Sequence, residues 1–150
     1  MLVSHKCVRQ AGPRDRTRVT AALVRCGGCA IARPDGQRGG AGTRLWHALQ
    51  RDGADVVAVK SDASAFFPGK CDLKEQLGAR AIDTILIAGA VTNICCESSA
   101  RDAAELEYKV IMISDALSGH AHGLHEATLA TFYRIVGDVR PSEEVIRLLR

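Results

Sequence analysis

The chain has 150 residues, of which 47% are hydrophobic, 25% charged and 4% aromatic, and its formal net charge is +3. This composition is typical of one soluble globular domain with a core of its own. The scarcity of aromatic residues argues against a base-stacking nucleic-acid surface, and no apolar run reaches the roughly 18 to 20 residues of a membrane span.

Residues 1–53 contain few recognisable elements. MLVSH is compatible with a strand, and Arg- and Gly-rich segments surround a weak apolar run, VTAALVRC. Residues 1–55 hold ten Lys or Arg against four Asp. A nucleic-acid-binding arm is one interpretation of this charge. A solvated, loop-rich segment is the favoured one, because no aromatic residues are interleaved.

From residue 56 onward, strand and helix patterns alternate. The short β-branched run VVAVK (56–60) predicts a buried strand, and a loop with Pro68 and Gly69 follows it. The next predicted elements are a helix (71–81), a strand (84–91), a helix (95–107), a strand (109–117), a helix (125–136) and a last helix (141–150). Strands that are apolar on both faces are typical of a parallel sheet covered by helices. The pattern therefore predicts a single α/β domain over residues 1–150, with a mostly parallel sheet in a three-layer α/β/α arrangement.

Active sites of such sheets lie beyond the carboxyl ends of the strands. Lys60, the turn 92–95 and Asp115 all fall at predicted strand ends. A cysteine where a strand gives way to a helix meets unpaired backbone amides and the positive end of the helix dipole, which favour a thiolate. Cys95 and Cys96 lie at such a junction. The alternative is that both are small buried hydrophobic residues, the usual role of free cysteine.

Two segments carry a resemblance to a known family. They read KSDASAFFPG and IDTILIAGAVTNICCESSARDAAELEYKVIMISDAL, and the HEATL segment follows them. Residues 54–140 resemble the isochorismatase-like cysteine hydrolases, a superfamily that includes nicotinamidases and ureidoacrylate amidohydrolase. The resemblance implies the isochorismatase-like fold and cleavage of an amide or ureido C–N bond in a small molecule.

The resemblance also implies roles for individual residues. Cys95 is expected to be the nucleophile that forms a thioester, and Lys60 the catalytic lysine. The backbone amides of Val91 and Cys95 are expected to form the oxyanion hole, with a cis peptide between Ala90 and Val91. Cys96 is expected to point into the core. No cofactor and no metal are implied, and relatives commonly form homo-oligomers through helices near the C-terminus.

One catalytic group of the family has no match. Relatives carry an aspartate at the end of their first strand, but none of Asp15, Asp35, Asp52 and Asp55 ends an apolar strand. MLVSHKCVRQAGPRDR resembles the second strand of the family and the loop after it, so we expect the first strand to be missing. The alternative function is therefore a catalytically impaired or silent member that serves only as an oligomer subunit, or has no role. Hydrolysis of a vinyl ether is a third hypothesis, against which the presence of Cys95 argues.

Residues near these positions have more than one interpretation. Phe66 and Phe67 follow Lys60 and form either a pocket wall or part of the core. Asp115 is expected to bond loops around the site, and Ser98 and Ser99 to bond back to helix carbonyls.

Two further groups resemble metal or redox motifs. For His120, His122 and His125, solvated or capping roles are favoured over a metal site. The pair Cys26 and Cys29 has no second C-x-x-C at zinc-finger spacing, so neither a zinc nor a redox role is favoured.

The cellular location is predicted from the same composition. The N-terminus has no long apolar region and no A-x-A site, which predicts no signal peptide and a cytoplasmic protein. The six cysteines are accordingly expected to be reduced thiols. The expected partner is a small amide or ureido substrate, with no nucleic acid and no membrane.

Overall fold

The computed structural model describes residues 2–9, 18–26 and 55–149, with side chains described for 55–149. Asp15, Asp35, Asp52 and Cys29, and with them much of the segment predicted to be loop-rich, lie outside these ranges. The elements in chain order are β1 (Leu2–Arg9), β2 (Arg18–Cys26), β3 (Val56–Lys60), α1 (Leu73–Gly78), β4 (Thr84–Ala90), a single π-helical turn η2 (Thr92–Cys96), α2 (Glu97–Glu105), β5 (Lys109–Ser118), α3 (His122–Ile135), β6 (Asp138–Arg140) and α4 (Ser142–Leu148).

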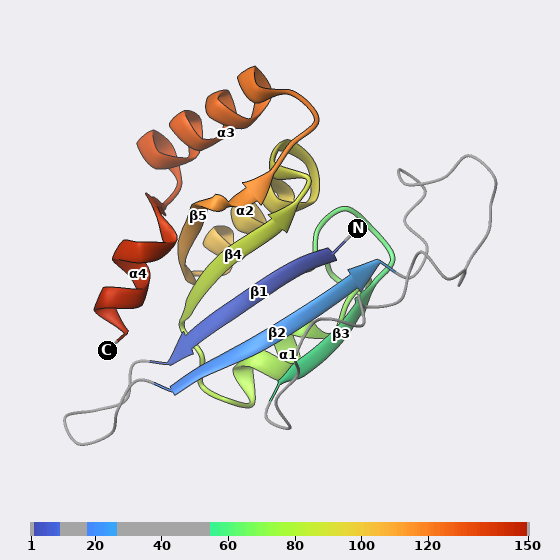
Figure 1. Ribbon diagram of the computed structural model, residues 1–150. Coiled ribbons are helices and arrows are strands. Elements are labelled where there is room, and N and C mark those ends of the chain that lie inside the picture. Colours follow the sequence, from blue (N-terminus) through green and yellow to red (C-terminus); the bar gives the residue numbers. More distant parts are fainter. Residues whose placement is uncertain (1, 10–17, 27–54, 150) are drawn as a thin grey trace.

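The strands form a twisted six-stranded sheet with the order β3-β2-β1-β4-β5-β6 (Figure 1). The pairs β2–β3, β4–β5 and β5–β6 are parallel, whereas β1 is antiparallel to both of its neighbours. The predicted α/β class with a mostly parallel sheet is confirmed. The segment that begins MLVSH occupies the place between β2 and β4, and its amino end lies beside the carboxyl ends of both, with Leu2 opposite Arg25 and Val3 opposite Gly89.

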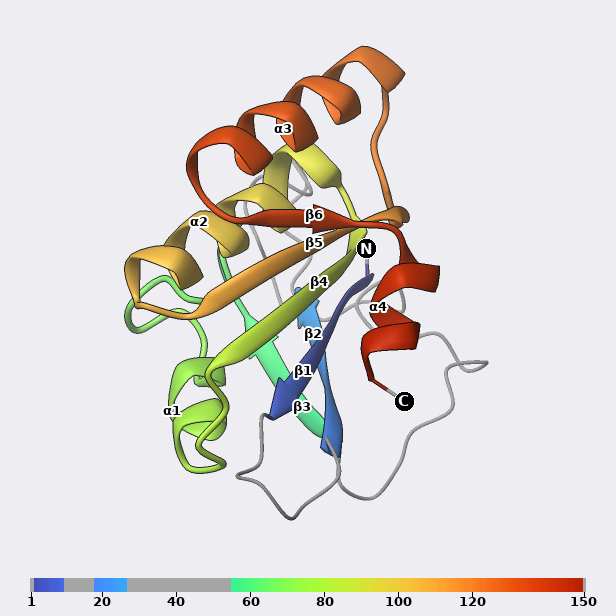
Figure 2. The same cartoon turned by 90° about the vertical axis from the view of Figure 1, so that its left-hand side faces the viewer.

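Helices cover both faces of the sheet. In Figure 2, α1 and α2 lie on one side of it and α4 on the other. Alternate residues of β4 face opposite ways: Ile85 belongs to the large core under α1, α2 and α3, while Leu86 packs with Val145 of α4. Full burial stabilises each such aliphatic side chain by about 1.5–3 kcal/mol, so the period-two alternation of β4 produces the three layers.

Several elements differ from the sequence prediction. The helix expected from residue 95 is preceded by the turn η2, and α3 begins at His122 rather than at residue 125. The strand β6 was not predicted, because its three residues, Asp138, Val139 and Arg140, show neither an apolar run nor a period. Two strands, β1 and β2, lie within the segment predicted to be loop-rich. Among the described residues, no helix has the length and apolar composition required to cross a membrane.

Candidate active site

The candidate site lies at the edge of the sheet where β2, β3, β4 and β5 end. Lys60 is the last residue of β3, and Cys26, the last residue of β2, pairs with it in register. Ala90 ends β4, and η2 with Cys95 follows directly. Strands β3 and β4 are separated by β2 and β1. Because β1 is antiparallel to both β2 and β4, and β2 is parallel to β3, strands β3 and β4 run in the same direction. Lys60 and the start of the cysteine turn therefore lie at the same edge of the sheet, as the sequence predicts.

The side chain of Lys60 is buried, with 1% of its surface exposed. Its Nζ donates hydrogen bonds to the backbone carbonyls of Asp62 at 2.6 Å and of Ala63 at 2.7 Å. The loop after β3 thus folds back around the ammonium group, and Asp62 stabilises this loop through its carboxylate, which accepts the amide of Ala63 at 2.8 Å. Within residues 55–149, no carboxylate forms an ion pair with Lys60. A buried cation whose partners within residues 55–149 are carbonyl dipoles favours an anion nearby.

The turn that carries Cys95 has an unusual backbone. The Ala90–Val91 peptide is cis, as the family resemblance implies. The carbonyl of Val91 accepts the amides of Ile94 and Cys96, both at 3.2 Å, and the second of these bonds spans five residues, which is the π-helical pattern. The amides on both sides of Cys95 are therefore directed at one carbonyl. Single π-helical turns are frequent at functional sites.

The two adjacent cysteines have different environments. Cys96 is completely buried in the large core, and Cys95 retains 3% exposure. The pKa of the Cys96 thiol is raised to about 12, chiefly by burial and also by the neighbouring Cys95, while the charge of Lys60 acts in the opposite direction. The charge of Lys60 therefore acts on the thiol of Cys96, which nevertheless stays protonated near neutral pH.

A buried hydrogen bond connects the loop of Lys60 to the helix of Cys95. The Oγ of Ser99, which is fully buried, accepts the amide of Ala65 at 3.0 Å. The sequence predicted that Ser99 would bond to carbonyls of its own helix. The structure shows a contact with a segment 34 residues away, which periodicity does not reveal because it depends on how α2 packs on the loop.

The two phenylalanines after Lys60 differ in exposure. Phe66 is 4% exposed, and its ring packs against Tyr108 with a centroid distance of 5.6 Å. Phe67 is 50% exposed. Of the two interpretations for Phe66, core packing is therefore the better supported, whereas the ring of Phe67 is half exposed to solvent.

Two polar contacts that the sequence did not predict join α3 to the cysteine turn. The Oγ1 of Thr92 lies 2.9 Å from Nδ1 of His125. The Oγ1 of Thr128 donates to Oε2 of Glu97 at 3.1 Å. His125, one of the three histidines of the H-x-H-x-x-H motif, is thus a hydrogen-bond partner of the turn. Among the described residues, no group of three or more metal-ligating side chains is found.

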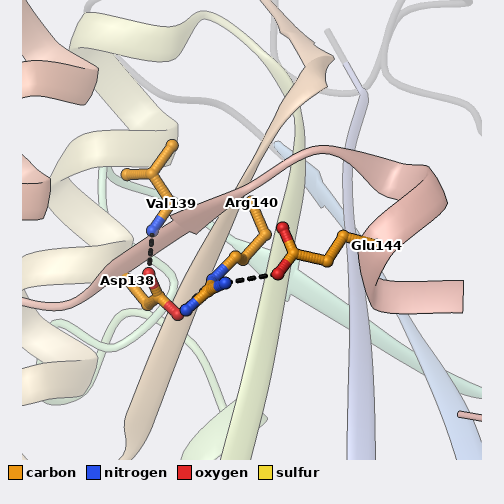
Figure 3. Close-up of polar contacts among 4 residues, drawn as sticks. All are labelled: Asp138, Val139, Arg140 and Glu144. Atoms are coloured by element: carbon orange, nitrogen blue, oxygen red, sulfur yellow. Dashed lines mark hydrogen bonds and ion pairs between the residues drawn. The ribbon is translucent and has the colours of Figure 1, made fainter. Parts of the chain in front are cut away.

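Asp115 has the loop-bonding role that the sequence predicted. Its carboxylate accepts the amide of Ser142 at 2.7 Å and the hydroxyl of the same residue at 2.6 Å, and these bonds hold its pKa below the usual range. The start of α4 is held a second time by Arg140, which Figure 3 shows between Asp138 and Glu144. Its Nε lies 2.7 Å from Oδ2 of Asp138, and it also forms an ion pair with Glu144.

Described residues line a cleft on each of two parts of the molecule, and the lining of these clefts includes neither Lys60 nor Cys95. One, of about 530 Å³, lies at the outer edge of β3 and is lined by Val57, Val59, Gly69, Lys70, Cys71, Asp72 and Glu75. The other, of about 590 Å³, lies beside α3 and is lined by Ser114, Asp115, His125, Glu126, Leu129, Ala130, Tyr133 and Val139. His125 connects the second cleft to the cysteine turn through its bond with Thr92.

Comparison with known families agrees with this geometry. The model of the isochorismatase domain matches residues 30–144, a range that contains Lys60, the cis peptide and both cysteines. The chain belongs to the isochorismatase family. The match begins upstream of residue 54, where the motif resemblance begins, so the family relationship extends into the segment whose pattern was weakest.

Relatives of this isochorismatase-family chain include both hydrolases and proteins without an assigned activity. The isochorismatase family protein YwoC of Bacillus subtilis (strain 168) is 41% identical over 96 residues, which are 64% of this chain and 50% of YwoC. Nicotinamidase 3 of Arabidopsis thaliana is 36% identical over 80 residues, 53% of this chain and 39% of the relative. The chain thus spans about half, or less, of the length of these curated relatives.

A solved structure supports the fold independently. The cysteine hydrolase from Pseudomonas syringae pv. phaseolicola 1448A superposes with a TM-score of 0.65 at 35% sequence identity, over 71% of this chain and 55% of that one. The similarity in structure therefore extends over most of the chain.

Proposed function

We propose that this isochorismatase-family chain is a cysteine hydrolase that cleaves the C–N bond of a small amide or ureido compound through a thioester on Cys95. The observation that carries the proposal is the buried ammonium of Lys60, whose charge acts on the thiol of Cys96, the neighbour of Cys95, and which forms no ion pair with a carboxylate of residues 55–149. The relatives support it by name, since one is a nicotinamidase and another a cysteine hydrolase.

In the proposed reaction, the thiolate of Cys95 attacks the carbonyl carbon of the substrate. Two of the three N–H groups of Lys60 are donated to carbonyls, and we assign the third to stabilise the thiolate. The backbone amides of Val91 and Cys95 hold the oxyanion of the tetrahedral intermediate. The C–N bond then breaks, the thiol proton leaves with the amine or ammonia, and a thioester remains. Water cleaves the thioester, which releases the acid and returns the thiol.

The proposed enzyme and the alternative, a catalytically impaired family member, differ in whether a group carries the thiol proton to the leaving amine. Asp55 is described, but it precedes β3 and so lies at the end of that strand opposite Lys60. We therefore assign no proton transfer to it. A catalytically impaired family member would keep the buried Lys60 and the cysteine turn but would cleave the C–N bond slowly, because it would lack the group that accepts the thiol proton and then donates it to the leaving amine.

Alkylation of each cysteine by iodoacetamide across pH 5–10, mapped by peptide mass, tests the proposal without knowledge of the substrate. We expect Cys95 to react fastest, with a midpoint below the roughly 8.5 of an ordinary thiol. Lys60→Met should raise that midpoint, whereas Lys70→Met, at an exposed position, should leave it unchanged. If Cys95 reacts no faster than Cys71 at any pH, the proposal is wrong.

A screen of small amides and ureido compounds then separates the two functions. Hydrolysis that disappears in Cys95→Ser identifies an active enzyme. If Cys95 is reactive toward iodoacetamide but no compound of the screen is turned over, whether or not a stable acyl adduct forms, the chain is the impaired member. We propose that no metal or organic cofactor takes part, which requires that the rate be unchanged after dialysis against a chelator.

We also propose that the chain forms a homo-oligomer and is cytoplasmic. Large apolar side chains remain exposed on the two C-terminal helices, at Leu124, Tyr133 and Ile135 of α3 and at Ile146 and Leu148 of α4. Such residues are typical of surfaces that contact another subunit. Sedimentation velocity at micromolar concentration tests this assignment, and a purely monomeric species contradicts it.

A further inference from the structure

The contacts between α3 and the cysteine turn fall on both sides of the proposed nucleophile. Thr92 lies three residues before Cys95, and Glu97 lies two residues after it. Their partners on α3, His125 and Thr128, are also three residues apart. Residues at this spacing share one face of a helix, so a single face of α3 forms hydrogen bonds to two residues of the segment 92–97.

The first of these contacts is closely packed. Thr92 is completely buried, and the side chain of His125 is only 16% exposed. A Cβ atom added at Gly119 would lie 3.6 Å from Cβ of His125 and 3.7 Å from Oγ1 of Thr92, so the loop before α3 closes over the pair. A buried hydroxyl is costly without a partner, and Thr92 therefore favours the arrangement in which His125 is in place. Thr92 is also bonded covalently to Val91, one of the two proposed oxyanion donors.

The second contact, between Thr128 and Glu97, involves a charged group. The carboxylate of Glu97 uses one oxygen, Oε2, for the hydroxyl of Thr128 and the other, Oε1, for Arg101. Both N–H donors of Arg101 that reach Oε1 lie at 2.8–3.0 Å. Because hydrogen bonds to charged groups are the stronger ones, this contact fixes the first turn of α2 relative to α3. Thr128 itself is buried, whereas the side chain of Glu97 is 22% exposed, so the bond is partly shielded from water.

From this geometry we infer that His125 and Thr128 are positioning residues, which hold the segment 92–97 in the arrangement that the proposed reaction needs. The inference rests on the proposed function, since it concerns the reactivity of Cys95. Neither residue has to contact the substrate. Their effect is to keep the Val91 amide, the Cys95 thiol and the start of α2 fixed relative to one another, because a donor or nucleophile displaced by a fraction of an ångström loses much of its effect.

Matched substitutions on α3 test this inference. Thr128→Val removes the bond to Glu97 with little change in volume, and Thr131→Val is its control at an exposed position of the same helix. His125→Leu removes the bond to Thr92, and His122→Leu is its exposed control. His125→Asn is the conservative variant, because its amide group reaches the position of Nδ1.

Two readouts are needed on each variant: hydrogen exchange of the amides of residues 92–97, and the rate of alkylation of Cys95 at pH 7. We expect Thr128→Val and His125→Leu to lose about threefold to tenfold in protection and in alkylation rate, the controls to lose neither, and His125→Asn to recover most of both. A loss of protection without a change in the Cys95 rate would overturn the inference, because α3 would then serve stability alone.

The experiment also separates this inference from the proposed function. Equal protection and equal Cys95 rates in all variants would overturn the role of α3, while rapid, Lys60-dependent alkylation of the unsubstituted chain would keep the proposed function intact. If Cys95 of the unsubstituted chain reacts no faster than Cys71, the proposed function fails, and the positioning role fails with it. The rate in the unsubstituted chain alone distinguishes these two results.

Discussion

The buried thiol of Cys96 makes the stability of the fold depend on alkaline pH. Its pKa is raised from the ordinary 9.0 to about 12, mainly by burial. The unfolded chain releases this proton near pH 9, but the folded chain keeps it until about pH 12. Between these values the unfolded state binds fewer protons, so the free energy of unfolding must fall as pH rises. Below pH 9 the contribution of Cys96 to stability is fully present.

The size of this effect follows from the two pKa values. At pH 10, one unit above the ordinary value, the loss is about 1.4 kcal/mol, which is a tenfold decrease in the ratio of folded to unfolded chains. Cys96→Val keeps a small apolar side chain at this completely buried position and cannot ionise. Any cost of fitting the valine is independent of pH, and the variant should therefore lack this part of the alkaline loss.

Urea denaturation of both proteins at pH 7, 8, 9 and 10, in the presence of a reductant, measures the difference directly. Lysines, tyrosines and the other cysteines titrate in both chains, and their contributions cancel when the two free energies of unfolding are subtracted at each pH. The difference should be constant from pH 7 to pH 8 and should then shift in favour of Cys96→Val by about 1.4 kcal/mol at pH 10. Parallel curves over the whole range would refute the reasoning and would mean that Cys96 ionises in the folded chain as easily as in the unfolded one.

Two further predictions concern the packing and the start of α4. Gly137→Ala should destabilise the fold by about 1–3 kcal/mol, because the added Cβ would lie 2.7 Å from the carbonyl oxygen of Val110. Gly78→Ala, whose Cβ would meet nothing within 4 Å, is the matched control in the same urea titrations. Equal changes in the free energy of unfolding for the two variants would contradict the close approach. Asp115→Asn should lower the free energy of unfolding at pH 7, since the pKa of Asp115 is depressed by its bonds from Ser142. This stabilisation is present above the ordinary pKa of about 3.9 and disappears as pH falls through the lower folded value. A difference in stability between the two proteins that is equal at pH 7 and pH 2 would disprove the prediction.

Much of the fold from residue 56 onward was predictable from the sequence. The runs 56–60, 84–91 and 109–117 are apolar and β-branched over the length of a strand, and helical spacings separate them. Because parallel strands place their carboxyl ends at one edge, this order was sufficient to predict that Lys60 and the turn of Cys95 meet there. The motif resemblance added the cis peptide at Ala90–Val91, which composition and periodicity alone do not indicate.

Other features depended on how the elements pack. The strand β6 is too short for a periodic signal. The Arg- and Gly-rich composition around β1 and β2 did not suggest that both strands lie inside the sheet, between β3 and β4. The place of β1 depends on its pairing with β4, a strand distant in sequence. Phe66 and Phe67 differ in exposure, and only the packing shows this: the ring of Phe66 contacts Tyr108, a residue distant in sequence.

What the sequence by itself determined is therefore the identity and order of the chemical groups: a lysine and a cysteine at strand ends, and helices that begin beside them. Only the tertiary structure decided which side chains hold these groups in place. The bonds from Ser99 to Ala65, from Thr92 to His125 and from Thr128 to Glu97 each join residues more than 30 positions apart. Their existence depends on the distances at which α2 and α3 pack on the sheet, and those distances are determined by the shape of the shared core rather than by any local pattern.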